Sequence, residues 1–161
     1  MVGRIPVKDV SPVVDLGRHA AKATVGEPMP VRATVFREGH DRLGAEVVIT
    51  APDGTRRAPV RMRPLAPGTD RWEAWVTPDT TGDWTFEIHS CSDPIGTWQH
   101  DAPIKITAGV DVELMFTEGR LLLQRVLDSD QLSEHDRAVL AGGIDAATDT
   151  DRPVAARLAA L

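Results

Sequence analysis

Short segments in which apolar and polar residues alternate fill the first two thirds of the chain. In one of them Val31, Ala33 and Val35 fall on the same side, because successive side chains of an extended strand point to opposite faces. The segment 71–76 alternates in the same way and places Trp75 opposite its more apolar face. Such alternation predicts strands that bury one face and expose the other.

Turn residues separate these segments at intervals of about ten residues, a spacing typical of antiparallel sandwiches. The turns are marked by Pro52-Asp53-Gly54, by Pro67-Gly68-Thr69-Asp70 and by Thr81-Gly82-Asp83. We expect about seven or eight strands, over 4–10, 20–25, 31–36, 45–50, 55–63, 71–76, 84–89 and 98–107. The segment 84–89 is expected to be a central strand. The predicted fold is mainly β, an immunoglobulin-like antiparallel β-sandwich.

The spacing of apolar residues becomes helical near residue 108. Val110, Leu114, Leu121 and Val126 can share one stripe of a first helix that ends near Asp130. Strands are therefore expected to come first and helices to follow.

Cap residues predict two further helices. Ser133, with Asp136 three positions later, resembles a capping box and begins the second helix. Asp151 can cap a third helix, whose first turn admits Pro153 because the missing amide hydrogen loses no internal bond there. This third helix reaches Leu161 with an apolar face and no cap, so we expect the chain to be truncated.

These patterns divide the 161 residues into a sandwich over 1–108 and a short C-terminal extension of about three helices over 109–161. We expect the extension to pack on the sandwich. A chain of this length is close to the usual size of one domain, roughly 100–200 residues, which excludes a two-domain enzyme.

Composition excludes several classes of function. The chain has 18 basic and 24 acidic residues, a formal charge of −6, which disfavours binding to nucleic acid or to anionic membrane surfaces. No apolar run approaches the roughly 20 residues of a membrane span, and no signal sequence is recognised, so a cytoplasmic location is expected. Cys91 is the single cysteine, which excludes an internal disulfide and a thiolate-rich metal site.

One loop gathers residues that suit acid–base chemistry. Arg37, Glu38, His40 and Asp41 surround Gly39 directly after a predicted strand. A catalytic dyad built on His40 is one interpretation, and a solvated or interface turn in which Gly39 takes a strained backbone angle is the other. The turn is the interpretation that we favour.

No other pattern of catalysis or cofactor binding is recognised. The five histidines lack the spacing of a zinc motif, and glycine-rich phosphate loops and nucleophile elbows are missing. The acidic residues show no framework that would hold a catalytic pair. The sequence therefore predicts no catalytic residue, no metal site and no cofactor.

The four tryptophans offer a different possibility, because sugar rings stack on exposed aromatic faces. Trp75 and Trp98 are the candidates for contact with a glycan or for an interface. The alternative is that all four tryptophans lie in the core or between domains, and the strand pattern favours the core for Trp72 and Trp84.

Several long motifs resemble one family in order along nearly the whole chain. They are GRIPVKDVSPVV at 3–14, ATVFREGHD at 33–41, LAPGTDRW at 65–72, IKITAG at 104–109 and RPVAARL at 152–158. The chain resembles the amino-terminal domain of the α-1,4-glucan:maltose-1-phosphate maltosyltransferases, which belong to the α-amylase clan (glycoside hydrolase family thirteen).

The resemblance implies a parent enzyme that transfers maltosyl units to an α-1,4-glucan with retention of configuration. In that family an aspartate nucleophile and a glutamate acid/base belong to a (β/α)₈ barrel, which is expected to follow Leu161. The amino-terminal domain of the family packs beside that barrel and contributes to a homodimer. The chain itself is then a non-catalytic accessory and dimerisation domain; the alternative is an α-glucan-binding module.

Overall fold

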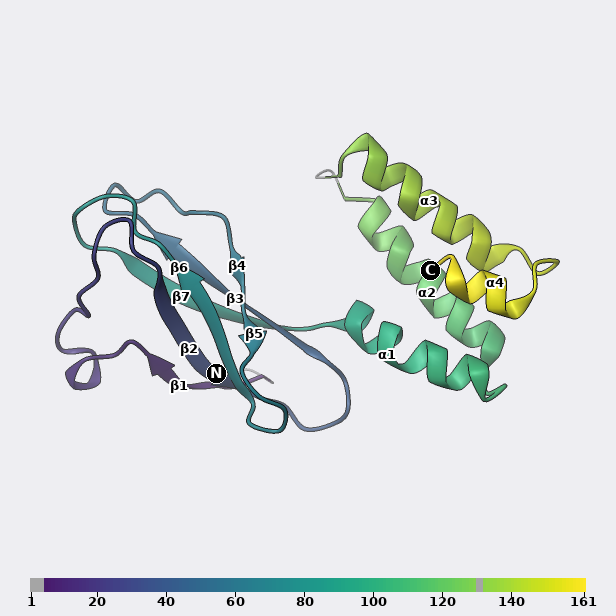
Figure 1. The fold of residues 1–161 in the computed structure, drawn as a ribbon, viewed down its shortest axis with the longest axis horizontal. Helices are drawn as coiled ribbons and strands as arrows, with labels where there is room; N and C mark the ends of the chain where they lie inside the picture. The colour runs from purple at the N-terminus through teal and green to yellow at the C-terminus, as the bar shows by residue number, and fades with distance from the viewer. Residues whose placement is uncertain (1–4, 130–131) are drawn as a thin grey trace. The chain divides into compact units, whose positions relative to one another are not determined.

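The computed structural model describes residues 5–129 and 132–161. These residues form two compact units, one that ends at Ser92 and one that begins at Asp93 (Figure 1). The first unit is built of strands and the second of helices. The change from strands to helices therefore comes at Asp93 and not near residue 108, where the sequence pattern places it.

The first unit contains a four-stranded antiparallel sheet in the order β1-β2-β6-β5. Its strands are β1 (Val7–Ser11), β2 (Met29–Val35), β6 (Arg71–Val76) and β5 (Arg63–Pro64). A single 3₁₀ turn, η1 (Asp15–Gly17), lies between β1 and β2. The pairing of β2 with β6 fixes which side chains share a face, because cross-strand partners point to the same side.

A three-stranded antiparallel sheet in the order β4-β3-β7 completes the sandwich. Its strands are β3 (Leu43–Thr50), β4 (Val60–Arg61) and β7 (Thr85–Ser92). Among the described strands β7 pairs with β3 alone, so it lies at the edge of its sheet. The expectation that 84–89 is a central strand is wrong.

The inward faces of both sheets form one apolar core. The alternating residues of β2, β3 and β6 supply most of it: Val31, Ala33, Val35, Ala45, Val47, Ile49, Ala74 and Val76. Trp72 and Trp84 pack against this core with partly buried rings. The predicted phase of the strands at 31–36 and 71–76 is confirmed, and so is the mainly β fold class with a helical C-terminal part.

The second unit consists of α1 (Pro94–Thr107), α2 (Val112–Leu127), α3 (Glu134–Thr148) and α4 (Val154–Ala159). Helix α2 packs against both α1 and α3, and α4 packs against α3. The core of this helical unit joins residues of α1, α2 and α3, namely Trp98, Ala102, Ile106, Met115, Phe116 and Ala147. The three helices predicted after residue 109 correspond to α2, α3 and α4.

The expectation of a strand over 98–107 is wrong, because this segment lies in α1. The carboxylate of Asp93 caps α1 by accepting a hydrogen bond from the amide of Gly96 at 2.8 Å, and Pro94 occupies the first turn. Trp98, Ala102 and Ile106 recur every four residues, the period of a helix face, and all three are buried.

Two further expectations from the sequence are wrong. The segment 20–25 forms no strand. Asp151 does not cap α4: the N-cap position is held by Pro153, and no side chain bonds to the first amides there. Ser133, in contrast, caps α3 as predicted, because its Oγ accepts a hydrogen bond from the amide of Asp136 at 3.1 Å.

Candidate functional site

The outward face of the four-stranded sheet carries an exposed tryptophan. Trp75 lies on β6 with 53% of its surface exposed, which confirms the predicted orientation. Its ring is not free to turn, because the indole Nε1 donates a hydrogen bond to Oε1 of Glu73 at 2.9 Å. Trp75 and Glu73 stand two positions apart on one strand and so point to the same side of the sheet.

Glu73 is held in turn by an arginine of the neighbouring strand. Arg32 on β2 is the cross-strand partner of Glu73, and its Nε donates to Oε2 at 2.5 Å. This hydrogen bond lowers the pKa of Glu73, so the carboxylate keeps its charge to more acidic pH than an ordinary glutamate. Trp75, Glu73 and Arg32 thus form a connected row on the sheet surface, which we call the Trp75 platform.

Further residues extend this face on both sides of the platform. Pro30 lies opposite Trp75 on β2, and Arg63 lies opposite Glu73 on β5. Arg71 is engaged elsewhere, since its guanidinium donates to the carbonyl of Asp9 and to the hydroxyl groups of Ser11 and Thr34. These bonds tie β6 to β1 across β2 and keep the sheet face in place.

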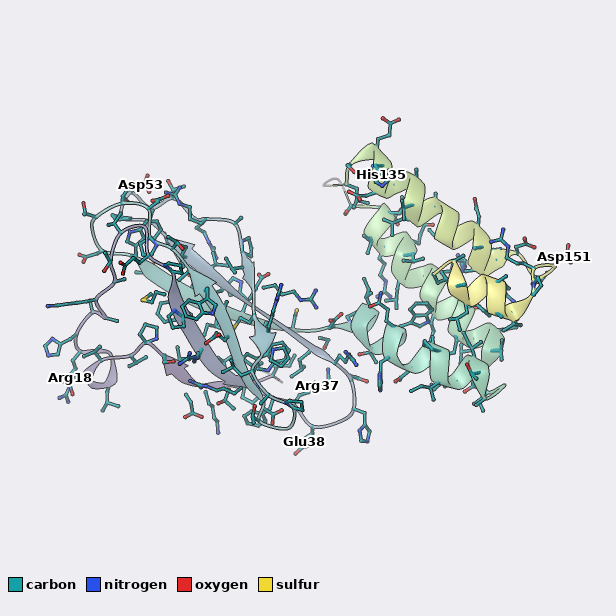
Figure 2. The ribbon with its side chains drawn as sticks, in the orientation of Figure 1. Arg18, Arg37, Glu38, Asp53, His135 and Asp151 are labelled. Carbon is teal, nitrogen blue, oxygen red and sulfur yellow. The ribbon has the colours of Figure 1, made fainter. Side chains whose placement is uncertain are left out.

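The loop at 37–41 contains an ion pair that does not include its histidine. Arg37 donates through Nη1 to Ser92 Oγ at 2.9 Å and through Nη2 to Asp41 Oδ2 at 3.0 Å. Glu38 is exposed, and Figure 2 shows it close to Arg37. With Phe36 it lines a pocket. His40 is exposed as well. Within residues 5–129 and 132–161 it makes no hydrogen bond or ion pair with Glu38 or Asp41.

Trp98 lies in the core of the helical unit and is only 8% exposed. Its Nε1 donates to the carbonyl of Met115 at 2.7 Å. The six-membered part of the ring lies against the backbone of α2 at Gly119, where a Cβ would come within 2.7 Å of Cε2. The expectation that Trp98 offers an exposed face to a glycan is therefore wrong, because the packing of α1 against α2 buries its ring.

An open apolar cleft of about 630 Å³ lies at one end of the sandwich. Trp84 and Phe86 line it, together with the segment around Val13 and Val25. Trp84 donates its Nε1 to the carbonyl of Thr80 at 3.0 Å, so the ring is fixed inside the first unit. The lining is mostly apolar, and its polar side chains are those of His19, Thr80, Thr81, Asp83 and Thr85.

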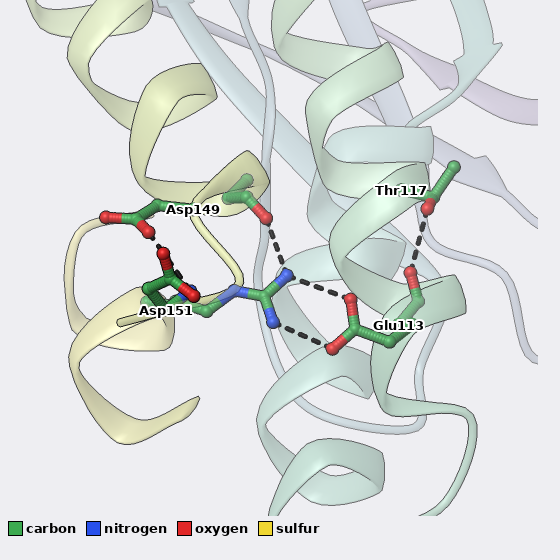
Figure 3. A network of polar contacts seen from close by, with 6 residues as sticks. Glu113, Thr117, Asp149 and Asp151 are labelled. Atoms are coloured by element: carbon green, nitrogen blue, oxygen red, sulfur yellow. Dashed lines mark hydrogen bonds and ion pairs between the residues drawn. The ribbon is translucent and has the colours of Figure 1, made fainter. Parts of the chain in front are cut away.

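A buried arginine of α4 was not anticipated from the sequence. The side chain of Arg157 is 3% exposed, and its two terminal nitrogens donate to Glu113 on α2 at 2.7 and 3.0 Å (Figure 3). A further bond of 2.6 Å joins it to the carbonyl of Ala147. Arg157 is the single charged residue between Val154 and Leu161, and that isolation within an apolar run was the available signal.

Neither a metal site nor a membrane-spanning helix is found in the described part of the chain. Among residues 5–129 and 132–161 no group of three or more His, Cys, Asp or Glu could hold a metal ion. Every helix in those ranges is too short or too polar to cross a membrane.

Comparison with known proteins gives a consistent result. A family model described as alpha-1,4-glucan:maltose-1-phosphate maltosyltransferase, domain N/S, matches residues 3–161. The chain is 51% identical over 160 residues to alpha-1,4-glucan:maltose-1-phosphate maltosyltransferase 1 of Streptomyces coelicolor, with 99% of this chain and 24% of that protein covered. Maltosyltransferase 2 of the same organism is 48% identical over 159 residues, with the same coverage.

More distant relatives carry the same description. The alpha-1,4-glucan:maltose-1-phosphate maltosyltransferase of Mycobacterium tuberculosis is 38% identical over 148 residues, which cover 76% of this chain and 21% of that protein. The chain spans about a quarter of the length of the curated relatives it matches. Since the family model covers residues 3–161, the chain belongs to the α-1,4-glucan:maltose-1-phosphate maltosyltransferase family and corresponds to its domain N/S.

Proposed function

We propose that this chain is a non-catalytic accessory domain of an enzyme that lengthens α-1,4-glucans with maltosyl units from maltose 1-phosphate. The observation that carries the proposal is the family match over residues 3–161 in a chain about a quarter as long as its relatives. The transfer, with retention of configuration, then belongs to a (β/α)₈ barrel elsewhere in the parent protein. This chain buttresses that barrel and helps to pair two subunits.

Exposed apolar side chains on the first unit support a role in contacts with another domain. Leu16 is 90% exposed. It stands on a turn in which both Asp15 and Leu16 have a positive φ, of 46° and 56°. Such a conformation is uncommon for residues other than glycine, above all for a bulky side chain, and strained residues of this kind cluster at functional sites. A large apolar side chain held out in this way suits a surface that another domain covers.

The helical unit exposes apolar residues as well. Leu114 and Leu121 lie seven positions apart on α2, which places them on one side of the helix, and both are exposed. Val139 on α3 is also exposed. These side chains favour a second contact surface, and we assign it to the homodimer.

The strand order supports an immunoglobulin-like sandwich. Four strands in the order β1-β2-β6-β5 correspond to strands A, B, E and D of that fold, and β3 and β7 take the places of C and F. We also propose a cytoplasmic location, for which the exposure of the single thiol, Cys91, is the supporting observation, because an oxidising compartment would leave it open to pairing between molecules.

Phosphate release tests the accessory role. The chain mixed with maltose 1-phosphate and maltoheptaose should release no phosphate, whereas maltosyltransferase 1 of Streptomyces coelicolor serves as the active control. Turnover by the chain alone at the rate of that enzyme would refute the proposal.

A chimera gives the complementary test. This chain should replace the aligned segment of the Streptomyces coelicolor enzyme with phosphate release retained, because the two segments are 51% identical. A chimera that folds, judged by a cooperative thermal transition, and yet releases no phosphate would contradict the accessory role.

Sedimentation equilibrium tests the pairing. The parent enzyme should sediment as a dimer, and Leu114→Glu with Leu121→Glu should shift it toward the monomer. Glu118→Gln on the same helix is the control, since it changes charge without placing it on the apolar positions. A mutant that remains fully dimeric would remove α2 from the proposed interface.

A further inference from the structure

We propose that the Trp75 platform binds a segment of α-1,4-glucan, with one glucose ring stacked on the indole of Trp75. The proposal rests on the proposed function, because the family assignment is what makes an α-1,4-glucan the polysaccharide at hand. It adds a binding surface outside the reaction centre of the parent enzyme.

The ring of Trp75 is already oriented for stacking. More than half of its surface is exposed, and its position on a paired strand fixes the backbone beneath it. The bond from Nε1 to Glu73 holds the ring in one orientation, so little side-chain freedom is lost when a ligand binds. A flat, exposed indole offers the apolar C–H face of a pyranose a surface of matching shape.

The polar groups beside the ring suit sugar hydroxyl groups. Each carboxylate oxygen of Glu73 accepts one bond, from Trp75 or from Arg32, and retains a second acceptor position. Arg32 uses Nε for this contact, which leaves the N–H groups of its terminal nitrogens as donors. A hydroxyl group both donates and accepts, so it can bond to Glu73 and to Arg32 alike.

The charge balance of the platform favours a neutral ligand. Arg32 and Glu73 compensate each other in a direct ion pair, with a side-chain exposure of 43% and 15%. Arg63, opposite Glu73 on β5, adds N–H groups that can donate to neutral hydroxyl groups as well as to anions. A net charge of −6 on the whole chain disfavours polyanions. A neutral polysaccharide meets both conditions.

A second copy of the chain fits the platform less well. Stable protein interfaces bury about 800 Å² on each partner around several apolar side chains. The outward positions of β2 and β6 instead alternate one aromatic ring with charged and hydroxyl groups, because Arg32, Thr34 and Glu73 share this face with Trp75. Desolvating the ion pair against the apolar side chains of another protein would cost free energy, whereas sugar hydroxyl groups can replace the hydrogen bonds to water that the pair loses.

Calorimetric titration of the chain with maltoheptaose tests the platform. We expect saturable binding that Trp75→Ala weakens by about tenfold or more, as is usual when the central aromatic of a contact is removed. Trp75→Phe should retain part of the affinity, because it keeps a ring but loses the bond to Glu73. Ile104→Ala is the matched control, since it truncates another exposed apolar residue in the helical unit and should leave binding unchanged.

Three results would overturn the proposal. The first is equal affinity of Trp75→Ala and the unaltered chain, or no binding by either, with both folded by circular dichroism. The second is cellohexaose binding as tightly as maltoheptaose, which would exclude selection of the α-1,4 linkage. Self-association that Trp75→Ala abolishes, without glucan binding, would assign the surface to a second copy and also refute it. Phosphate release by the chimera is independent of these titrations, so the platform and the accessory role can fail separately.

Discussion

The guanidinium of Arg157 lies over the ring of Phe116, with 3.8 Å between its central carbon and the ring centroid. Phe116 is the largest fully buried side chain of the described residues. The same guanidinium forms a two-pronged ion pair with Glu113, one turn earlier on α2. Arg157 thus joins α4 to α2 through both a cation–π contact and an ion pair.

Replacing Arg157 by Met should destabilise the helical unit. The substitution keeps an apolar stem over Phe116 but removes the bonds to Glu113 and to the carbonyl of Ala147. We expect a loss of about 2 kcal/mol, less than for a stranded buried charge, because the Glu113 left behind is exposed. Urea unfolding followed by far-UV circular dichroism measures it.

Arg152→Met is the control for this substitution. The side chain of Arg152 forms only an exposed ion pair, with 3.6 Å between its Nε and Oδ2 of Asp149. Such pairs contribute little to the free energy of unfolding. If Arg157→Met and Arg152→Met unfold at the same urea concentration, Arg157 does not hold α4 in place.

The ion pair of Arg157 should also make stability depend on pH. Hydrogen bonds from Arg157 lower the pKa of Glu113 below its ordinary value of 4.5. The unfolded chain therefore binds a proton at Glu113 more readily than the folded chain does. The stabilisation from this pair is complete above pH 4.5 and is lost as the pH falls through the lower, folded pKa.

Glu113→Gln isolates this contribution. The variant should be less stable than the unaltered chain at neutral pH, and the difference should shrink as the pH falls below 4.5. Glu118→Gln removes a negative charge from the same helix, and its stability difference from the unaltered chain should not shrink in this way as the pH falls. A difference that stays constant with pH would show that Glu113 does not act through its charge. Urea unfolding at a series of pH values provides the comparison.

Two glycines in the helical unit should respond to alanine in opposite ways. A Cβ on Gly119 would lie 2.7 Å from Cε2 of Trp98, a buried ring that cannot move aside, so Gly119→Ala should cost about 1–3 kcal/mol. Gly142 on α3 has open space around the corresponding position. There alanine should stabilise by about 0.5–1 kcal/mol, because it lowers the conformational entropy of the unfolded chain. Thermal unfolding measures whether each variant is more or less stable than the unaltered chain. A Gly119→Ala variant that is more stable would contradict the packing of Trp98.

Local patterns predicted the sandwich well because strand alternation is a property of neighbouring residues. The phase of Val31 and Trp75 followed from a period of two, and Ser133 was recognised as a cap from residues within one turn. The ion pair of Glu113 with Arg157 joins residues 44 positions apart, so no local pattern could indicate it.

The error over 98–107 has a different cause. The run Ile104-Lys105-Ile106-Thr107 alternates as a strand does, and short apolar runs do not distinguish strands from helices. The deciding signals were Asp93 followed by Pro94, a cap residue and a first-turn proline, and the four-residue spacing that begins at Trp98. The alternation along the strand predicted that Trp75 is exposed. It could not predict the bond of Trp75 to Glu73 or the contact of Arg32 with Glu73, because these depend on side-chain orientation and on the pairing of β6 with β2.

The interior proline of α1 provides a test of this helix. Pro103 is exposed and lacks the amide that would bond to the carbonyl of Gln99, which costs a helix about 3 kcal/mol relative to alanine. Proline also stiffens the unfolded chain, which offsets about 1 kcal/mol of this cost. Pro103→Ala should therefore stabilise the helical unit by about 2 kcal/mol in urea unfolding. Pro94→Ala is the control, because a proline in the first turn loses no helical bond and its removal should bring no gain. If Pro103→Ala leaves stability unchanged or lowers it, residues 94–107 are not held as a continuous helix.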